Sequence, residues 1–152
     1  MFEHDFVNYP ELTNKELAEI GFMSPFPQIT NNFIGVVEKV HDGDTVTLSC
    51  DFRDFVFPLR FLSVDAPELN TGIPGEESRD WLAGQVEGEE VEVLINPMNR
   101  VEKYGRLLGD LKVAGIPIGE SMVQLGFALP FGRRREGDLP SVDKLLAVNQ
   151  WF

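Results

Sequence analysis

Three strand-like runs joined by tight turns, between residues 34 and 64, constrain the fold more than any other feature of the sequence. IGVVEKV is followed by the turn HDGD, by TVTLSCD, by a second turn near Arg53 and by FVFPLRFLSV. Runs of this length, rich in β-branched and aromatic residues and separated by turn formers, are typical of an antiparallel meander. We expect Gly43 to supply the positive φ of the first turn, and Pro58 to mark an edge position or a bulge.

The segments that follow predict two more strands and further helices. EESRDWLAGQVE has a helical pattern that places Trp81, Leu82 and Val86 on the buried side. VEVLINP and RLLGDLKV have the pattern of a fourth and a fifth strand, and IGESMVQLGF has that of a short helix ending near Gly126. A last helix is expected over residues 140–148.

Five short strands, with a helix between the third and the fourth, are typical of a small closed barrel of the oligonucleotide-binding kind. We therefore predict an α+β fold: a five-stranded Greek-key OB-fold barrel with about three helices and a short N-terminal extension. A chain of 152 residues accommodates one such domain. Composition changes near residue 33, so we divide the chain into an extension over residues 1–33 and a barrel domain over residues 34–152.

The extension predicts one short helix. Thr13 and Glu16 have the spacing of a capping box, and Gly21 is placed to end the helix after about two turns. Pro25 and Pro27 then favour an irregular, extended path. Such an extension can dock either on this domain or on another protein.

Charge and hydropathy exclude several classes of protein. No stretch approaches the ~20 apolar residues of a membrane span, and the first residues lack the pattern of a secretory signal. We expect a soluble, monomeric, cytoplasmic protein, in which the single Cys50 is a buried apolar side chain. A formal net charge of −12 argues against attraction of nucleic acid by the whole surface, so any phosphate contact should be local.

Two acidic motifs are candidates for a cation site. His41-Asp42-Gly43-Asp44-Thr45 lies at a strand turn, where aspartate and glycine are also expected for purely structural reasons. In Val64-Asp65-Ala66-Pro67-Glu68 a strand ends, and its two carboxylates can face the same way or belong to a solvated acidic loop. Hard cations such as calcium bind several carboxylate, carbonyl and water oxygens, so the two motifs together indicate a plausible ion site.

Two basic features accompany them. Arg60 alternates with Leu59 and Phe61 and shares a face with apolar neighbours, so it is either solvent-facing or half-buried beside an anionic partner. The loop that contains Lys103-Tyr104-Gly105-Arg106 follows Arg100, and its mixture of basic and aromatic residues suits a phosphate and a stacked base as well as an ordinary solvated hairpin. Phosphodiester hydrolysis needs a cation, a carboxylate to activate water and fixed positive charges, and all of these are present.

The order HDGDTV, LRFLSVDAPE, EKYGR and GIPIGESMVQLGFA resembles the thermonuclease, or staphylococcal nuclease-like, family over roughly residues 34–130. The resemblance implies a calcium ion as cofactor. It also implies that Asp44 and Asp65 supply carboxylate ligands, that Ala66 supplies a carbonyl oxygen, and that Asp42 is a further carboxylate near the ion.

The same resemblance assigns catalysis and substrate binding. Glu68 matches the general base, and Arg60 and Arg106 match two arginines that grip the phosphate. Lys103 and Tyr104 fall where the family contacts the terminal phosphate and the nucleotide.

The chain departs from the family in its acidic surface and in the loop LPFGRRR, where Phe131 would stack in place of a tyrosine. The resemblance implies calcium-dependent cleavage of DNA or RNA, preferentially single-stranded, by a water that Glu68 activates. The alternative is a catalytically weak or inactive OB-fold module that uses residues 1–33 to dock a protein partner.

Overall fold

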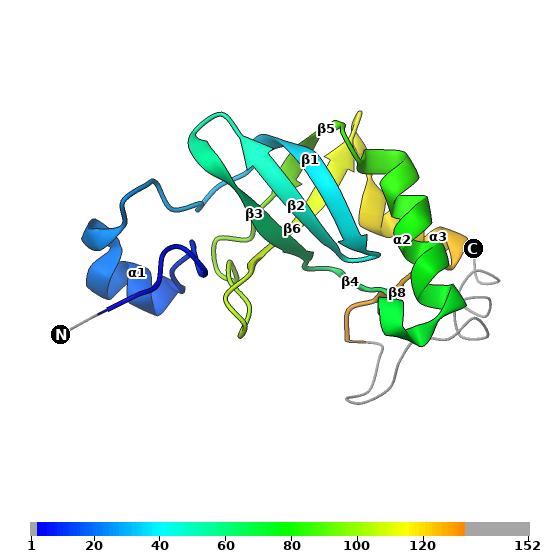
Figure 1. The fold of residues 1–152 in the computed structure, drawn as a ribbon, viewed down its shortest axis with the longest axis horizontal. Helices are drawn as coiled ribbons and strands as arrows, with labels where there is room; N and C mark the ends of the chain where they lie inside the picture. Colours follow the sequence, from blue (N-terminus) through cyan, green and yellow to red (C-terminus); the bar gives the residue numbers. More distant parts are fainter. Residues whose placement is uncertain (1–2, 133–152) are drawn as a thin grey trace.

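Five strands close into a barrel in the computed structural model, which describes residues 3–132 (Figure 1). They are β1 (Phe33–Asp42), β2 (Thr45–Cys50), β3 (Arg53–Phe61), β5 (Glu90–Leu94) and β6 (Leu107–Val113). Hydrogen bonds join them in the order β3-β2-β1-β5-β6, and a pairing between β3 and β6 closes the ring. The closing pair is parallel and the other pairs are antiparallel. The predicted α+β fold with a five-stranded Greek-key barrel is confirmed.

Helices and short strands surround the barrel. The helices are α1 (Asn14–Ile20), α2 (Ile73–Val86) and α3 (Ile118–Leu125), with short 3₁₀ turns η1 (Gly21–Met23) and η2 (Leu69–Thr71). The short strands are β4 (Val64–Asp65), β7 (Ile116–Pro117) and β8 (Leu129–Pro130). The helix expected over residues 140–148 lies outside the described residues. Across residues 3–132, no helix combines the length and the apolar character needed to cross a membrane.

The core fills the barrel and continues under α2. Phe57, Leu59 and Phe61 point inward from β3, and α2 covers the barrel with Leu82 and Val86, as predicted. Burying each such side chain contributes about 1.5–3 kcal/mol to folding. Figure 1 shows α2 and α3 at one end of the molecule and α1 at the other, with the barrel between them.

The turn between β1 and β2 corrects one prediction. Gly43 does not have a positive φ. Glycine is instead required by close packing, because a Cβ there would lie 2.0 Å from Ser78 Oγ and 2.6 Å from Ala66 Cβ. Pro58 pairs in register with β2, whereas the pairing with β6 begins only at Leu59, which agrees with an edge position.

The N-terminal segment, defined here as residues 3–32, docks on the barrel. Thr13 and Glu16 form the predicted capping box at the start of α1. The adjoining Leu12 is fully buried, and so is Glu11, whose carboxylate lies 2.6 Å from Arg53 Nη2 and 3.1 Å from Arg100 Nη2. A carboxylate shared between two guanidinium groups therefore joins the segment to β3 and to the loop before β6.

Arg100 shares its loop with Lys103 and Arg106, but its guanidinium is bonded to the N-terminal segment. Its Nε donates to the Ile29 carbonyl at 2.6 Å, and its Nη1 donates to the Leu12 carbonyl at 3.0 Å. The Arg100 side chain is 1% exposed, and its charge is paired with the buried Glu11 carboxylate.

Candidate active site

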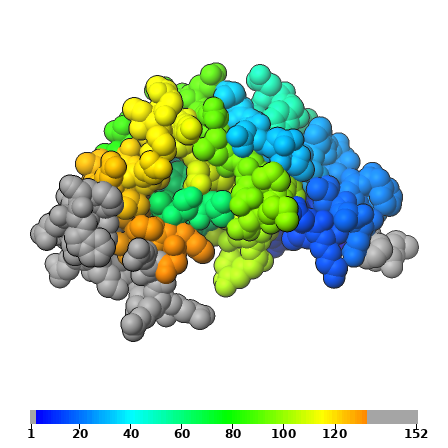
Figure 2. Space-filling model, turned by 180° about the vertical axis from the view of Figure 1, so that it is seen from behind, coloured from blue at the N-terminus to red at the C-terminus, as the bar shows by residue number. Residues whose placement is uncertain are grey.

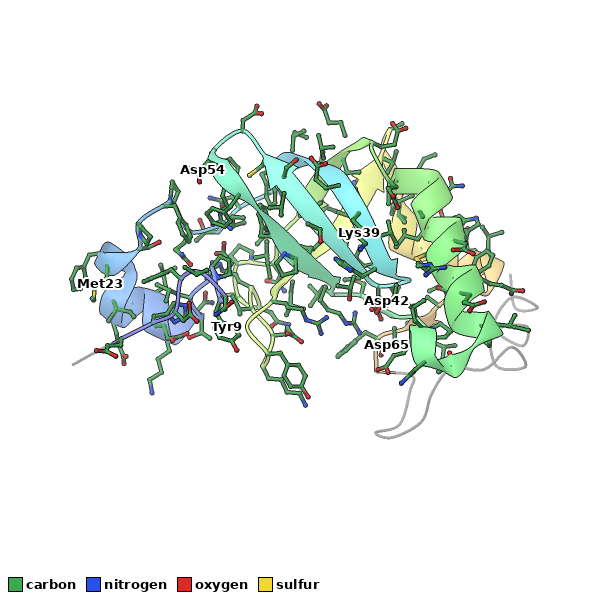
Figure 3. The ribbon with its side chains drawn as sticks, viewed as in Figure 1. Tyr9, Met23, Lys39, Asp42, Asp54 and Asp65 are labelled. Atoms are coloured by element: carbon green, nitrogen blue, oxygen red, sulfur yellow. The ribbon has the colours of Figure 1, made fainter. Side chains whose placement is uncertain are left out.

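A polar pocket of about 520 Å³ lies at one end of the barrel, between the β1–β2 turn, the chain after β4 and the loop between β5 and β6 (residues 95–106, the β5–β6 loop). Figure 3 shows Asp42 and Asp65 close together at this end. The pocket gathers nearly all of the site residues predicted from the sequence. These are Asp42, Asp44, Arg60, Asp65, Ala66, Glu68, Lys103, Tyr104 and Arg106.

Phe131 is the predicted site residue that the structure does not bring into this lining. It follows β8 and is 65% exposed. Its backbone N–H donates to the Ser63 carbonyl at 2.8 Å, which fixes the chain there without turning the ring into the pocket lining.

Asp44 is the most buried carboxylate of the pocket. Its Oδ2 accepts from the Ala66 N–H at 3.0 Å, and its Oδ1 accepts from the Thr45 hydroxyl at 3.2 Å. Burial, aided by the neighbouring Asp42 and opposed by Arg60, raises the pKa of Asp44 to about 7. Burial is thus the main reason that the ionised form of Asp44 is disfavoured, although Arg60 lies nearby.

Arg60 lies between Asp44 and Asp65, the two carboxylates that the family resemblance implies as metal ligands. Its Nη2 lies 3.3 Å from Asp44 Oδ2 and donates a short hydrogen bond to Asp65 Oδ1. Its Nη1 donates to the Phe61 and Val64 carbonyls. The half-buried arginine thus has the anionic partners that the alternation of β3 required.

Arg106 is held by a carboxylate that sequence reasoning missed. Its Nε donates to Glu102 Oε1 at 2.9 Å and its Nη2 donates to Oε2 at 3.1 Å, while Nη1 donates to Thr45 Oγ1 at 3.3 Å. The hydrogen bonds with Glu102 raise the pKa of Arg106, and the side chain stays charged. Through Thr45, the second arginine is also linked to Asp44.

Glu68 is exposed at the mouth of the pocket, directly before η2. Its backbone is held by the first turn of α2, because a Cβ on Gly75 would lie 2.1 Å from the Glu68 carbonyl oxygen. The absence of a side chain at Gly75 therefore allows α2 to pack against the Glu68 backbone, and this packing fixes the backbone position of Glu68. No sequence pattern marked Gly75, since it reads as an ordinary glycine in a turn-rich loop.

Lys103 and Tyr104 form the outer rim of the pocket on the β5–β6 loop. The Tyr104 ring is 64% exposed, and Lys103 Nζ lies 5.1 Å from its centroid. The cation and the aromatic face are thus both presented to solvent beside the arginines.

The oxygen atoms that line the pocket are of the type that binds calcium. Asp42, Asp44 and Asp65 line the pocket and offer carboxylate oxygens, the ligand type that calcium prefers. Within the described residues, no three acidic, histidine or cysteine side chains are already gathered closely enough to hold a metal ion. The Arg60 guanidinium occupies the space between Asp44 and Asp65 instead.

Comparison with known proteins places the chain beside a known family and a relative from a bacterium. Residues 58–150, more than half of the chain, match the family model described as staphylococcal nuclease homologue. An uncharacterized protein of Bacillus anthracis, pXO1-141, is 27% identical over 130 residues, which cover 82% of this chain. The matched region is 55% of that relative, so the chain spans about half of its length.

Proposed function

The chain belongs to the staphylococcal nuclease homologue family, and from that premise we propose that it is a calcium-dependent phosphodiesterase that cleaves DNA or RNA, preferentially single-stranded. The observation that carries the proposal is the convergence of Glu68, Arg60 and Arg106 on one pocket with the aspartates. These residues lie far apart in the sequence, so their meeting is a property of the fold.

Glu68 is the group best placed to activate water. It is exposed at the pocket mouth, where a carboxylate can accept a proton from a water that attacks the phosphorus atom. The water oxygen then bonds to phosphorus, the bond from phosphorus to the 5′ oxygen breaks, and that oxygen takes up a proton. The product strand retains a 3′-phosphate.

The two arginines would stabilise the charge that builds on the phosphoryl oxygens. Arg106 is oriented by Glu102 on one side and keeps its guanidinium edge toward Thr45, inside the pocket. Arg60 exchanges part of its bonding to the aspartates for bonding to the phosphate. Calcium, when bound by Asp44, Asp65 and the Ala66 carbonyl with Asp42 nearby, supplies positive charge that polarises the phosphate.

Lys103, Tyr104 and Phe131 are proposed to contact the substrate outside the reacting phosphate. Lys103 offers a charge for a second phosphate, and Tyr104 offers an exposed face for a base. Stacking requires unpaired bases, which is why single strands are favoured. Phe131 follows β8, is exposed and lies outside the pocket lining, so it would act only on a more distant nucleotide.

The substitution Glu68→Gln tests the proposal. It keeps the size of the side chain and removes the proton acceptor, so kcat should fall by about 10²–10⁴-fold. Cleavage of single-stranded DNA, duplex DNA and RNA is measured with calcium, magnesium or chelator at low salt. Glu76→Gln, a change at another exposed glutamate in the first turn of α2, is the matched control and should retain activity.

A binding or assembly module without catalysis is the second candidate, and the net charge of −12 favours it. Under that alternative, neither the unmodified protein nor the Glu68→Gln variant cleaves in any metal, and both remain folded. If the unmodified protein cleaves and Glu68→Gln cleaves at the same rate, Glu68 is not the base.

A further inference from the structure

A second groove, of about 370 Å³, lies beside the pocket between the N-terminal segment and the β5–β6 loop. We call it the side groove. Its lining from the N-terminal segment includes His4, Tyr9 and Thr13. Glu102, Lys103 and Tyr104 line both the side groove and the catalytic pocket, so the two hollows share one wall. Figure 2 shows the N-terminal segment against the β5–β6 loop.

The outer wall of the side groove is held in place by buried contacts. Arg100, at the start of the basic part of the loop, binds Glu11 and the backbone of the N-terminal segment. Further along the loop, Tyr9 packs on Gly105, where a Cβ would lie 2.7 Å from the tyrosine ring. His4 Nε2 lies 2.7 Å from the Tyr9 carbonyl oxygen. The segment is therefore a formed wall against the loop that carries the predicted substrate contacts.

Among the described residues, the carboxylates that line the side groove are paired, whereas Lys103, which also lines it, is not. Glu11 is buried between two arginines, and Glu102 is bonded to Arg106. Glu16 caps α1 and lies 3.3 Å from His4. Lys103 forms no ion pair with any of residues 3–132, so its charge is available to a phosphate. Carboxylates line this groove, but each has a partner.

Two tyrosines flank the same space. Tyr9 is 49% exposed on the N-terminal side, and Tyr104 is 64% exposed on the loop (Figure 3 labels Tyr9). Exposed aromatic rings beside a cation form the surface on which unpaired bases stack, and this stacking tolerates any base.

We propose that the side groove is a second nucleotide subsite, in which a single strand leaving the catalytic pocket passes Lys103 and stacks a base on Tyr9. The inference rests on the proposed function, because it concerns the path of the same substrate. It assigns the N-terminal segment a direct role in binding nucleic acid. The strand that it binds is longer than the catalytic pocket alone holds, in keeping with the roughly 4–16 nucleotides that OB folds cover.

The test compares substrates of different length on the variant Tyr9→Ala. In the unmodified protein, kcat/KM should be higher for a single-stranded octanucleotide than for a dinucleotide. Tyr9→Ala should lower kcat/KM for the octanucleotide about tenfold, through KM, because one stacking contact is lost. The dinucleotide should be cleaved as before, since it does not reach the side groove.

Two further variants interpret the result. Tyr9→Phe keeps the aromatic face and should preserve the preference for the longer substrate. Val7→Ala changes a strongly exposed residue of the same segment that does not line the side groove, and it should leave both substrates unaffected. An equal loss on both substrates in Tyr9→Ala would show that Tyr9 only positions the loop, and would overturn the proposal. No loss on either substrate would overturn it as well.

A binding measurement separates this inference from the proposed function. Fluorescence anisotropy with a labelled octanucleotide and a labelled dinucleotide is carried out on Glu68→Gln at low salt. Length-dependent binding that Tyr9→Ala abolishes supports the subsite even if the protein cleaves nothing. The subsite would be rejected, and the proposed function retained, if cleavage depends on Glu68 but the affinity is the same for both oligonucleotides and is unchanged in Tyr9→Ala.

Discussion

At the scale of single residues, the pocket is a set of opposite charges that bind one another. Arg60 binds Asp44 and Asp65, and Arg106 binds Glu102. These contacts orient the arginines before any phosphate arrives, so less reorganisation is needed when charge develops. The same contacts mean that a substrate has to compete for Arg60.

Asp44 makes the stability of the metal-free protein depend on pH. Its pKa in the folded state is about 7, whereas a carboxyl of ordinary pKa near 3.8 in the unfolded chain ionises much earlier. Between these values the folded state binds the additional proton, so the contribution of Asp44 to the free energy of unfolding falls as pH rises from about 4 to about 7. Urea titrations across this range should show the fall for the unmodified protein and a smaller one for Asp44→Asn.

Calcium should reverse this trend, because it stabilises the ionised carboxylate. Binding of the ion should tighten as pH rises through about 7 and release protons, which calorimetry in buffers of different ionisation enthalpy detects. The same pH dependence in Asp44→Asn as in the unmodified protein would exclude Asp44 as its source.

At the scale of elements, the N-terminal segment is tied to the barrel by a buried charge cluster. Glu11 binds Arg53 of β3 and Arg100 before β6, and the Arg53 guanidinium also lies over aromatic rings. Those rings belong to Phe26, Phe55 and Phe57, at 4.7–5.0 Å from the ring centroids. One of them comes from the segment and two come from β3, so packing and charge act at the same junction.

Removing the shared carboxylate should therefore destabilise the whole fold. Glu11→Ala leaves two buried arginines without their partner, and the free energy of unfolding should fall by about 3–5 kcal/mol. Glu19→Ala removes an exposed glutamate from the same segment and should change stability little. Chemical denaturation of both variants measures the difference, and equal midpoints would show that the cluster contributes no net stability.

Local patterns predicted the elements of the fold, and the family resemblance supplied most residues of the candidate site. Sequence reasoning failed where the structural reason is a contact between distant residues. Turn chemistry and alternation predicted the meander and the position of Arg60. Gly43 was assigned a positive φ because the contact with Ser78, from α2, cannot be seen in a turn sequence. The role of Arg100 was missed for the same reason, since its partner Glu11 lies 89 residues earlier.

At the scale of the whole molecule, three cations line a pocket that also holds several carboxylates, in an acidic protein of net charge −12. Attraction over long range is therefore weak or unfavourable, and binding depends on the few cations that face the substrate. Arg60, Arg106 and Lys103 are those that line the pocket.

Salt dependence should reveal how few cations take part. With three phosphate contacts, the logarithm of the binding constant for a single strand should fall against the logarithm of salt concentration with a slope of about −2. Anisotropy titrations with Glu68→Gln over a range of sodium chloride concentrations give the slope. A much steeper value would mean that basic residues outside the pocket also contact the strand.

The sharing of Glu11 by two arginines also sets an order for events on the ribosome. The N-terminal segment is synthesised before the barrel, but Glu11 gains its second partner only once Arg100 has emerged. Completion of the junction thus waits for the loop before β6, even though Glu11 precedes every strand of the barrel.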